Sequence, residues 1–225
     1  MATSFSPHPV DAASRAEEAV LTPVYEALAT RFLDSFPAAL PVWSDGKRTV
    51  GRELEFPIVD GDGRAADVRR LWNHLTAPGD LKIKYDTGTP NLIVEAAGAD
   101  FSYTIEVGVG TLELNTRPCR SLLEVAEIAE RGVARLVHAA ARMGWRVLGY
   151  GIQPVTKPGL QIMTPKQRYQ SLYRAMGAEW LWYTVTAADQ THVALARHEA
   201  IDLLNYGNLI TPALISLCAN SPVYE

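Results

Sequence analysis

The stretch GRELEFPIVD, residues 51–60, places two glutamates two positions apart in a run that otherwise has the character of a β-strand. Alternate side chains of an extended chain point to the same face, so Glu53 and Glu55 share one face of this strand. Leu54 and Phe56 point to the other face. Burying two neighbouring carboxylates without a cation costs several kcal/mol or forces one of them to hold a proton. The pair therefore indicates either a solvated acidic face or a divalent-metal site.

Two later runs place polar residues at the same two-residue spacing. GTLELNT puts Thr111, Glu113 and Asn115 on one face of an expected strand. ADQTHVAL puts Gln190 and His192 on one face of another. Carboxylate oxygens suit Mg²⁺ or Mn²⁺, and a neutral imidazole can join at a second metal. One such strand alone is typical of ordinary structural residues, whereas three together leave the metal site and the structural alternative equally open.

A basic segment, IMTPKQRYQSLYRAMG, is the other concentration of chemistry-bearing residues. Lys166 and Arg168 lie near the start of an expected helix, where they could attract a phosphate or a carboxylate. The alternative is that they are solvated charges flanking a packed face that includes Tyr169, and this alternative is favoured for Arg174. The sequence holds neither a Walker-type GxxxxGK[ST] motif nor a Rossmann glycine pattern. A bound nucleotide would therefore be held by metal and scattered basic groups.

Hydrophobic periodicity and turn residues predict helices between groups of strands rather than strict alternation of the two. We expect helices over 11–35 with a break near Thr22, over 66–77, over 121–144 with a capping box from Ser121 to Glu124, over 163–177 opened by Thr164 and Pro165, and over 197–220. We expect strands over 50–59, 81–86, 91–97, 101–109, 111–116, 146–154 and 179–195. This order predicts an α+β domain with a largely antiparallel sheet.

Composition narrows the function further. With 225 residues, 48% hydrophobic and 20% charged, the chain is able to bury one ordinary core. Its net charge of -4 argues against nucleic acid or an anionic membrane surface as the main partner. No apolar run reaches the length of a membrane span and the start lacks a secretory signal, so we expect a cytoplasmic protein. Cys119 and Cys218 are too few and too far apart for a disulfide framework or a zinc cluster, and we expect free thiols.

Four stretches together resemble the plant- and proteobacterial-type glutamate–cysteine ligases, the second glutamate–cysteine ligase family. They are GRELEF at 51–56, IMTPKQRY at 162–169, ADQTHVAL at 188–195 and LCANSPV at 217–223. Their order and spacing agree with the family pattern, and the resemblance runs from about Val50 to the last residue. IMTPKQRY and ANSP are the most specific of these elements.

The resemblance implies a fold like that of glutamine synthetase, a curved antiparallel sheet with flanking helices whose concave face holds Mg²⁺ ions and ATP. It implies an ATP-dependent ligase that activates the side-chain carboxylate of glutamate as an acyl phosphate. The amine of cysteine then attacks this acyl phosphate. The whole ligation is the first step toward glutathione. The small-molecule partners expected from the resemblance are glutamate, cysteine and ATP.

The resemblance also implies roles for individual residues. The expected catalytic residues are Glu53, Glu55 and Glu113, and the expected metal ligands are these three carboxylates and His192. The expected cofactor-binding residues are Gln190, His192, Lys166 and Arg168.

This sequence departs from the family pattern in three respects. The first strand continues as PIVD, where many members differ. His192 stands where the plant-like pattern has glutamine, and in this respect the sequence resembles the bacterial carboxylate–amine ligases of uncertain substrate. Members of the family are about twice as long, so we expect residues 1–49 to form a helical segment with its connection and 50–225 to form an incomplete, N-terminal part of the ligase domain. A ligase using another amine, or a truncated half without activity, therefore stays open. An incomplete sheet would expose an edge, so we also expect possible self-association.

Overall fold

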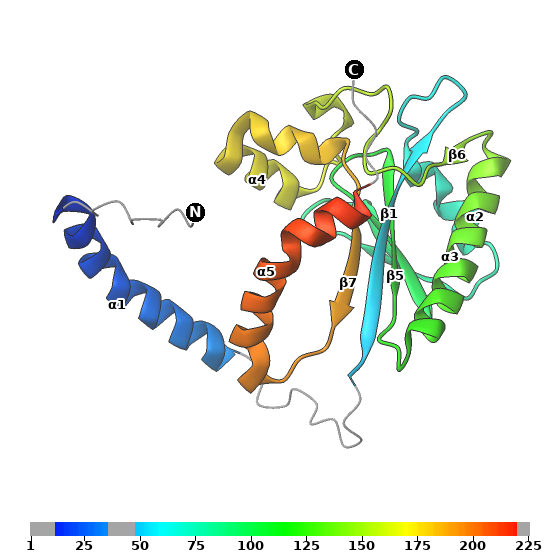
Figure 1. Cartoon of the computed structure of the whole chain (residues 1–225). Coiled ribbons are helices and arrows are strands. Elements are labelled where there is room, and N and C mark those ends of the chain that lie inside the picture. Colours follow the sequence, from blue (N-terminus) through cyan, green and yellow to red (C-terminus); the bar gives the residue numbers. More distant parts are fainter. Residues whose placement is uncertain (1–11, 36–47, 220–225) are drawn as a thin grey trace, which may run out of the picture. The chain divides into compact units, whose positions relative to one another are not determined.

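The computed structural model describes residues 12–35 and 48–219 (Figure 1). These residues fall into two compact units, one containing α1 (Ala12–Ser35) together with Leu195–Tyr206, and a larger one containing 48–194 and 207–219. The larger unit carries the whole sheet. Within the described ranges, no helix combines the length and the apolarity that crossing a membrane requires.

Seven strands form one antiparallel sheet, which confirms the predicted α+β class. They are β1 (Val50–Val59), β2 (Lys82–Tyr85), β3 (Ile93–Ala97), β4 (Phe101–Ile105), β5 (Thr111–Thr116), β6 (Arg146–Val147) and β7 (Asp189–Val193). The strand order is β2-β3-β4-β5-β1-β6, and β7 pairs with β1 along Val50–Leu54. The first strand begins and ends at the residues predicted from the sequence, and the meander from β2 to β5 is also confirmed.

One face of the sheet carries the hydrophobic core. Leu112 and Leu114 of β5 are fully buried and belong to a cluster that also includes residues of α2 (Trp72–Thr76) and α3 (Leu122–Arg142), which cover this face (Figure 1). The approach of α3 depends on Gly132, because a Cβ there would lie 2.6 Å from Leu114 Cδ1. Packing of Leu112 and Leu114 against the helices therefore holds β5 in place. The alternate residues of β5 form part of the opposite face of the sheet.

The start of α3 is anchored by side-chain hydrogen bonds. Ser121 is the N-cap, and its hydroxyl accepts a hydrogen bond from Glu124 N at 3.1 Å, as the capping box predicts. The return bond differs from the prediction, since Glu124 Oε2 accepts from Arg120 N at 2.7 Å. Arg117 Nη2 donates to the other Glu124 oxygen at 2.6 Å and draws the carboxylate toward the preceding segment. Gly144, with a φ of 72°, follows the helix as predicted.

Two predicted elements in the first half of the chain differ from the structure. The break expected near Thr22 is wrong, because α1 runs through Pro23 as one helix. A proline inside a helix removes one backbone hydrogen bond and crowds the carbonyl four residues earlier, and α1 continues as one helix in spite of both effects. The helix expected over 66–77 is a 3₁₀ turn, η1 (Val68–Leu71), followed by the short α2. The expected connection over 36–47 lies outside the described residues.

Two predicted strands in the second half are shorter than expected. The strand over 146–154 is reduced to the two residues of β6. The strand over 179–195 begins only at Asp189, since Gly177–Thr184 forms a 3₁₀ helix, η3. The run WLWYT has four large hydrophobic residues in succession before Thr184 and carries no two-residue period. Burial recurs at Trp180 and Thr184, a helical spacing.

The two later helices are present with shifted starts. α4 (Gln167–Met176) is preceded by Lys166 as its N-cap, so Thr164 does not open it. Thr164 is instead fully buried, and its hydroxyl donates to the carbonyl oxygen of Glu106 at 2.6 Å. The final predicted helix is α5 (Ala200–Cys218), which follows a 3₁₀ turn, η4 (Arg197–Glu199). Another short 3₁₀ turn, η2 (Leu160–Ile162), precedes α4.

Both cysteines are free thiols, as predicted. Cys119 is buried and Cys218 is exposed. The Cys119 thiol lies 3.1 Å from the carbonyl oxygen of Arg117, to which it donates. Burial raises the pKa of the Cys119 thiol, so this group is a packed side chain of the fold.

The core under β5 generates a stability prediction. Leu114→Ala removes a fully buried side chain between β5 and α3, so we expect the free energy of unfolding to fall by about 2–5 kcal/mol. Urea denaturation followed by circular dichroism measures this change. The matched control is Leu123→Ala on α3, whose side chain is 69% exposed. It is expected to change stability by less than about 0.5 kcal/mol, and equal losses in the two variants would contradict the assignment of the core.

Candidate functional site

The face of the sheet opposite the core carries polar side chains in register. Glu55 on β1 lies opposite Glu113 on β5, and Glu113 lies opposite Thr104 on β4. On the next row, Glu53 lies opposite Gln190 on β7. Directly opposed residues of an antiparallel pair have Cβ atoms about 4.5–5.5 Å apart. The pairing therefore brings together carboxylates that are 58 positions apart in the sequence.

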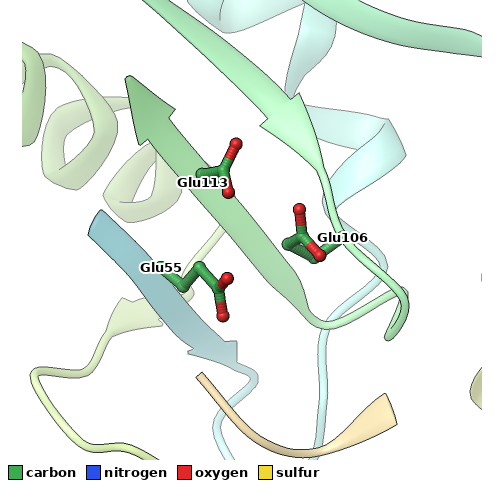
Figure 2. A group of neighbouring side chains, drawn as sticks. All are labelled: Glu55, Glu106 and Glu113. Carbon is green, nitrogen blue, oxygen red and sulfur yellow. The ribbon is translucent and has the colours of Figure 1, made fainter. Parts of the chain in front are cut away.

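A further carboxylate, Glu106, joins Glu55 and Glu113. One oxygen from each of the three lies within 4.8 Å of the others. Figure 2 shows the three side chains pointing toward a common space from β1, from β5 and from the end of β4. The sequence analysis did not single out Glu106, although it lies within the strand expected over 101–109, and in the structure it follows β4 by one residue. The signal was present, since Glu106 continues the two-residue spacing of Ser102 and Thr104.

Burial and mutual repulsion make these three carboxylates unusually weak acids. Burial, with help from the charges of Glu113 and Glu55, raises the pKa of Glu106 to about 8. Burial also raises the pKa of Glu55 to about 7, with the neighbouring carboxylates adding to the effect. The pKa of Glu113 is raised too, chiefly by burial and further by Glu53. Near neutral pH the cluster therefore holds protons unless a cation replaces them.

Hydrogen bonds from Asn115 on β5, from Gln190 on β7 and from Ala188, the residue before β7, hold two of the carboxylates. Asn115 Nδ2 donates to Glu113 Oε1 at 2.7 Å. Glu55 Oε2 accepts from the backbone N–H of Ala188 at 2.9 Å, and Gln190 Nε2 donates to Glu55 Oε1 at 3.4 Å. β7 therefore orients Glu55. The predicted contact of Gln190 with a cofactor stays a prediction, and the structure places its amide on Glu55.

Glu53 and His192 lie next to this cluster rather than in it. His192 Nε2 is 3.2 Å from Glu53 Oε1. The two residues share a cavity of about 380 Å³ with Asn115 and Thr116, among others. The four metal ligands expected from the sequence are thus divided, with Glu55 and Glu113 in the three-carboxylate cluster and Glu53 paired with His192.

Lys166 lies at the Glu106 end of the same face. It is the N-cap of α4, and its Nζ lies 5.1 Å from the centroid of the Tyr169 ring. Tyr169 is buried, and its hydroxyl donates to the carbonyl oxygen of Ile105 at 3.4 Å, which holds α4 against the end of β4. The positive charge of Lys166 favours the ionised form of Glu106 and so lowers its pKa. Arg168 is exposed on α4, and anion binding by either residue stays a prediction.

The donor set of the cluster suits a hard divalent cation. Three carboxylates, two from strands and one that directly follows β4, offer only oxygen ligands, which Mg²⁺ and Mn²⁺ prefer. A dication would neutralise the repulsion that raises the three pKa values. Glu55, Glu106 and Glu113 therefore fit such an ion by their chemistry and by their charge.

The raised pKa of Glu106 predicts a pH-dependent stability in the absence of divalent ions. The folded chain retains the proton of Glu106 up to about pH 8, whereas the unfolded chain loses it near 4.5. The folded state therefore binds more protons across this window and loses stability as pH rises through it. Glu106→Gln removes the titrating group. Urea denaturation in EDTA should show this variant about 1–3 kcal/mol more stable than the wild type above pH 8, with the difference closing toward pH 5.

An exposed glutamate on α3 provides the control for this experiment. Glu130→Gln is expected to change stability by less than about 0.5 kcal/mol at each pH. A Glu106→Gln variant that is less stable than the wild type at high pH would mean that the carboxylate is paired and structural.

Comparison with known proteins identifies the family. The family described as Glutamate-cysteine ligase family 2 matches residues 49–225. Proteins named "Putative glutamate--cysteine ligase 2" from Chloroflexus aggregans and Thermobifida fusca are 26% and 27% identical to this chain over 177 and 185 residues. These matches cover 78% and 80% of this chain, but only 40% and 41% of the relatives. The chain thus spans about two fifths of the length of the curated relatives it matches. Because the family match covers most of its residues, the chain belongs to glutamate–cysteine ligase family 2.

Proposed function

We propose that this chain serves an ATP-dependent ligase that joins the γ-carboxylate of glutamate to the amine of cysteine, the first step toward glutathione. The observation that carries the proposal is the convergence of Glu55, Glu106 and Glu113 on one face of the sheet, in a member of this ligase family. The names of the relatives supply the reaction class and its two amino acids. A reaction that consumes ATP and glutamate is consistent with the expected cytoplasmic location.

We also propose the glutamine-synthetase-like fold for the complete domain. An antiparallel sheet with helices on one face and carboxylates on the other supports it. Such a sheet holds charged ligands against rigid strands, which keeps the positions of the reacting groups fixed. The relatives are more than twice as long as the matched region, so the activity of the whole enzyme is part of the proposal.

Glu55, Glu106 and Glu113 would hold a Mg²⁺ ion on this face, and the Glu53–His192 pair offers ligands for a second. When bound, Mg²⁺ supplies positive charge that offsets the negative charge of the phosphates during phosphoryl transfer. Gln190 and the Ala188 N–H hold the Glu55 carboxylate in place. Lys166 at the Glu106 end is placed to attract an anionic group, either phosphate or carboxylate.

The proposed reaction requires two displacements. An oxygen of the glutamate γ-carboxylate attacks the terminal phosphorus of ATP, and the bond from that phosphorus to the bridging oxygen breaks as ADP leaves. The amine nitrogen of cysteine then attacks the acyl carbon, phosphate leaves with the electrons of the carbon–oxygen bond, and the nitrogen loses a proton. Neither displacement needs a covalent bond to the protein, so positioning and charge are what the chain has to supply.

Proton release on metal binding tests the carboxylate cluster. At pH 7 the raised pKa values of Glu55 and Glu106 leave the cluster partly protonated, so Mg²⁺ binding should release roughly one proton per ion. Isothermal titration calorimetry in buffers of different ionisation enthalpy measures this number. Glu55→Gln should weaken Mg²⁺ binding and keep the fold. An unfolded Glu55→Gln variant, or binding without proton release, would contradict the assignment.

Product analysis tests the reaction itself. The purified chain is incubated with ATP, Mg²⁺ and glutamate, with either cysteine or another amine as acceptor, and ADP and the ligated product are measured. Turnover that requires both glutamate and cysteine supports the proposal. Turnover with another amine would favour the alternative ligase that His192 indicates. Mg²⁺-ATP that raises the melting temperature without turnover would mean that this length holds the ligands but lacks groups for the reaction.

A further inference from the structure

Asn115 connects the carboxylate cluster to the neighbouring strand. Its Nδ2 donates to Glu113 Oε1 at 2.7 Å and to the hydroxyl oxygen of Thr104 at 3.1 Å. Asn115 lies on β5 two residues after Glu113, and Thr104 lies opposite Glu113 on β4. The three side chains therefore share the polar face, and one amide group spans two strands.

This arrangement uses the full donor capacity of the amide. An asparagine NH₂ group has two N–H donors, and here one serves Thr104 and the other serves Glu113. Turning the amide over would place its carbonyl oxygen against the Glu113 carboxylate, which accepts but does not donate when ionised. The network therefore selects one orientation of Asn115, and with it one position of Glu113 Oε1.

Glu55 and Glu113 differ in the hydrogen bonds that hold their carboxylates. Glu55 accepts from the backbone of Ala188 as well as from Gln190, and the Gln190 bond is long at 3.4 Å. A backbone donor persists when a side chain is changed. The hydrogen bond to Glu113 comes from the Asn115 side chain. At 2.7 Å it is shorter than the hydrogen bond from Gln190 to Glu55. A single substitution at Asn115 would therefore free the Glu113 carboxylate to reorient, whereas Glu55 would keep its backbone donor whichever side chain is changed.

We propose that Asn115 is a positioning residue that sets the preference of the cluster for Mg²⁺ over Ca²⁺, an inference that rests on the proposed metal-dependent function. Mg²⁺ requires near-octahedral geometry with short metal–oxygen distances, whereas Ca²⁺ accepts longer distances and variable coordination. A Glu113 carboxylate held by Asn115 keeps a fixed oxygen position. A released carboxylate still carries its charge but no longer keeps the geometry that the smaller ion needs.

The test compares the affinities of the whole chain for Mg²⁺ and Ca²⁺ by calorimetric titration with each metal alone, in the wild type and in Asn115→Ala. The titrations are made near pH 9, above the pKa of about 8 of Glu106, so that protonation contributes little. We expect the Mg²⁺ affinity of Asn115→Ala to fall about 10- to 100-fold and the Ca²⁺ affinity to fall less. The ratio of the two affinities therefore decreases.

Two further variants keep the test decisive. Asn73→Ala makes the same change at an exposed position on α2 and should leave both affinities unchanged. Thr104→Val removes the acceptor that orients the Asn115 amide and should lower the affinity ratio by a smaller factor, which provides an answer even where Asn115→Ala fails to fold. Equal losses for both metals, or no loss, would overturn the role of Asn115. A wild-type chain that binds neither metal would instead refute the metal site of the proposed function, and the role of Asn115 with it.

Discussion

Three carboxylates on one face of the sheet, with Glu113 buried and Glu55 and Glu106 partly buried, repel one another, and the fold holds them together against this repulsion. Two ionised oxygens 4.8 Å apart repel each other by about 3 kcal/mol at an effective dielectric constant near 20. The fold has to supply this free energy elsewhere, and the source is the opposite face of the same strands. Leu112 and Leu114 flank Glu113 in the sequence and are fully buried against the helices. The side chains of β5 alternate between the two faces of the sheet. The same six residues therefore contribute both to the stabilising core and to the destabilising carboxylate cluster.

The same repulsion also explains the electrostatic behaviour of the site. Without a cation, the cluster relieves its charge by holding protons, which is why the pKa values of Glu106 and Glu55 rise to about 8 and 7. A dication and these protons compete for the same oxygens. Asn115 donates to Glu113 and Gln190 donates to Glu55, so the two amides orient these carboxylates. The same hydrogen bonds favour the ionised forms and so lower the two pKa values against the larger effect of burial. The strands therefore hold the three proposed metal ligands close together in the absence of any ligand.

Much of this face could be predicted from the sequence, because the two-residue period of a strand depends only on local order. Alternation placed Glu53 with Glu55 and Glu113 with Asn115 correctly. It did not give the pairing of β7 with β1, which brings Gln190 onto Glu55 across 135 positions and is set by tertiary packing. Glu106 was missed although it lies in the strand expected over 101–109 and keeps the two-residue spacing of Ser102 and Thr104. The run WLWYT was assigned to a strand because its four consecutive large hydrophobic residues carry no period, and in the structure it is part of a 3₁₀ helix.

We propose that Glu55, Glu106 and Glu113 together form a divalent-metal site, and anomalous X-ray diffraction from crystals of the chain soaked in Mn²⁺ tests this proposal. Manganese prefers the same oxygen ligands as magnesium and scatters anomalously. We predict an anomalous peak among the three carboxylates in the wild type and its loss in Glu106→Gln. A peak that persists in Glu106→Gln, or strong manganese peaks elsewhere on the chain with none at the cluster, would contradict it.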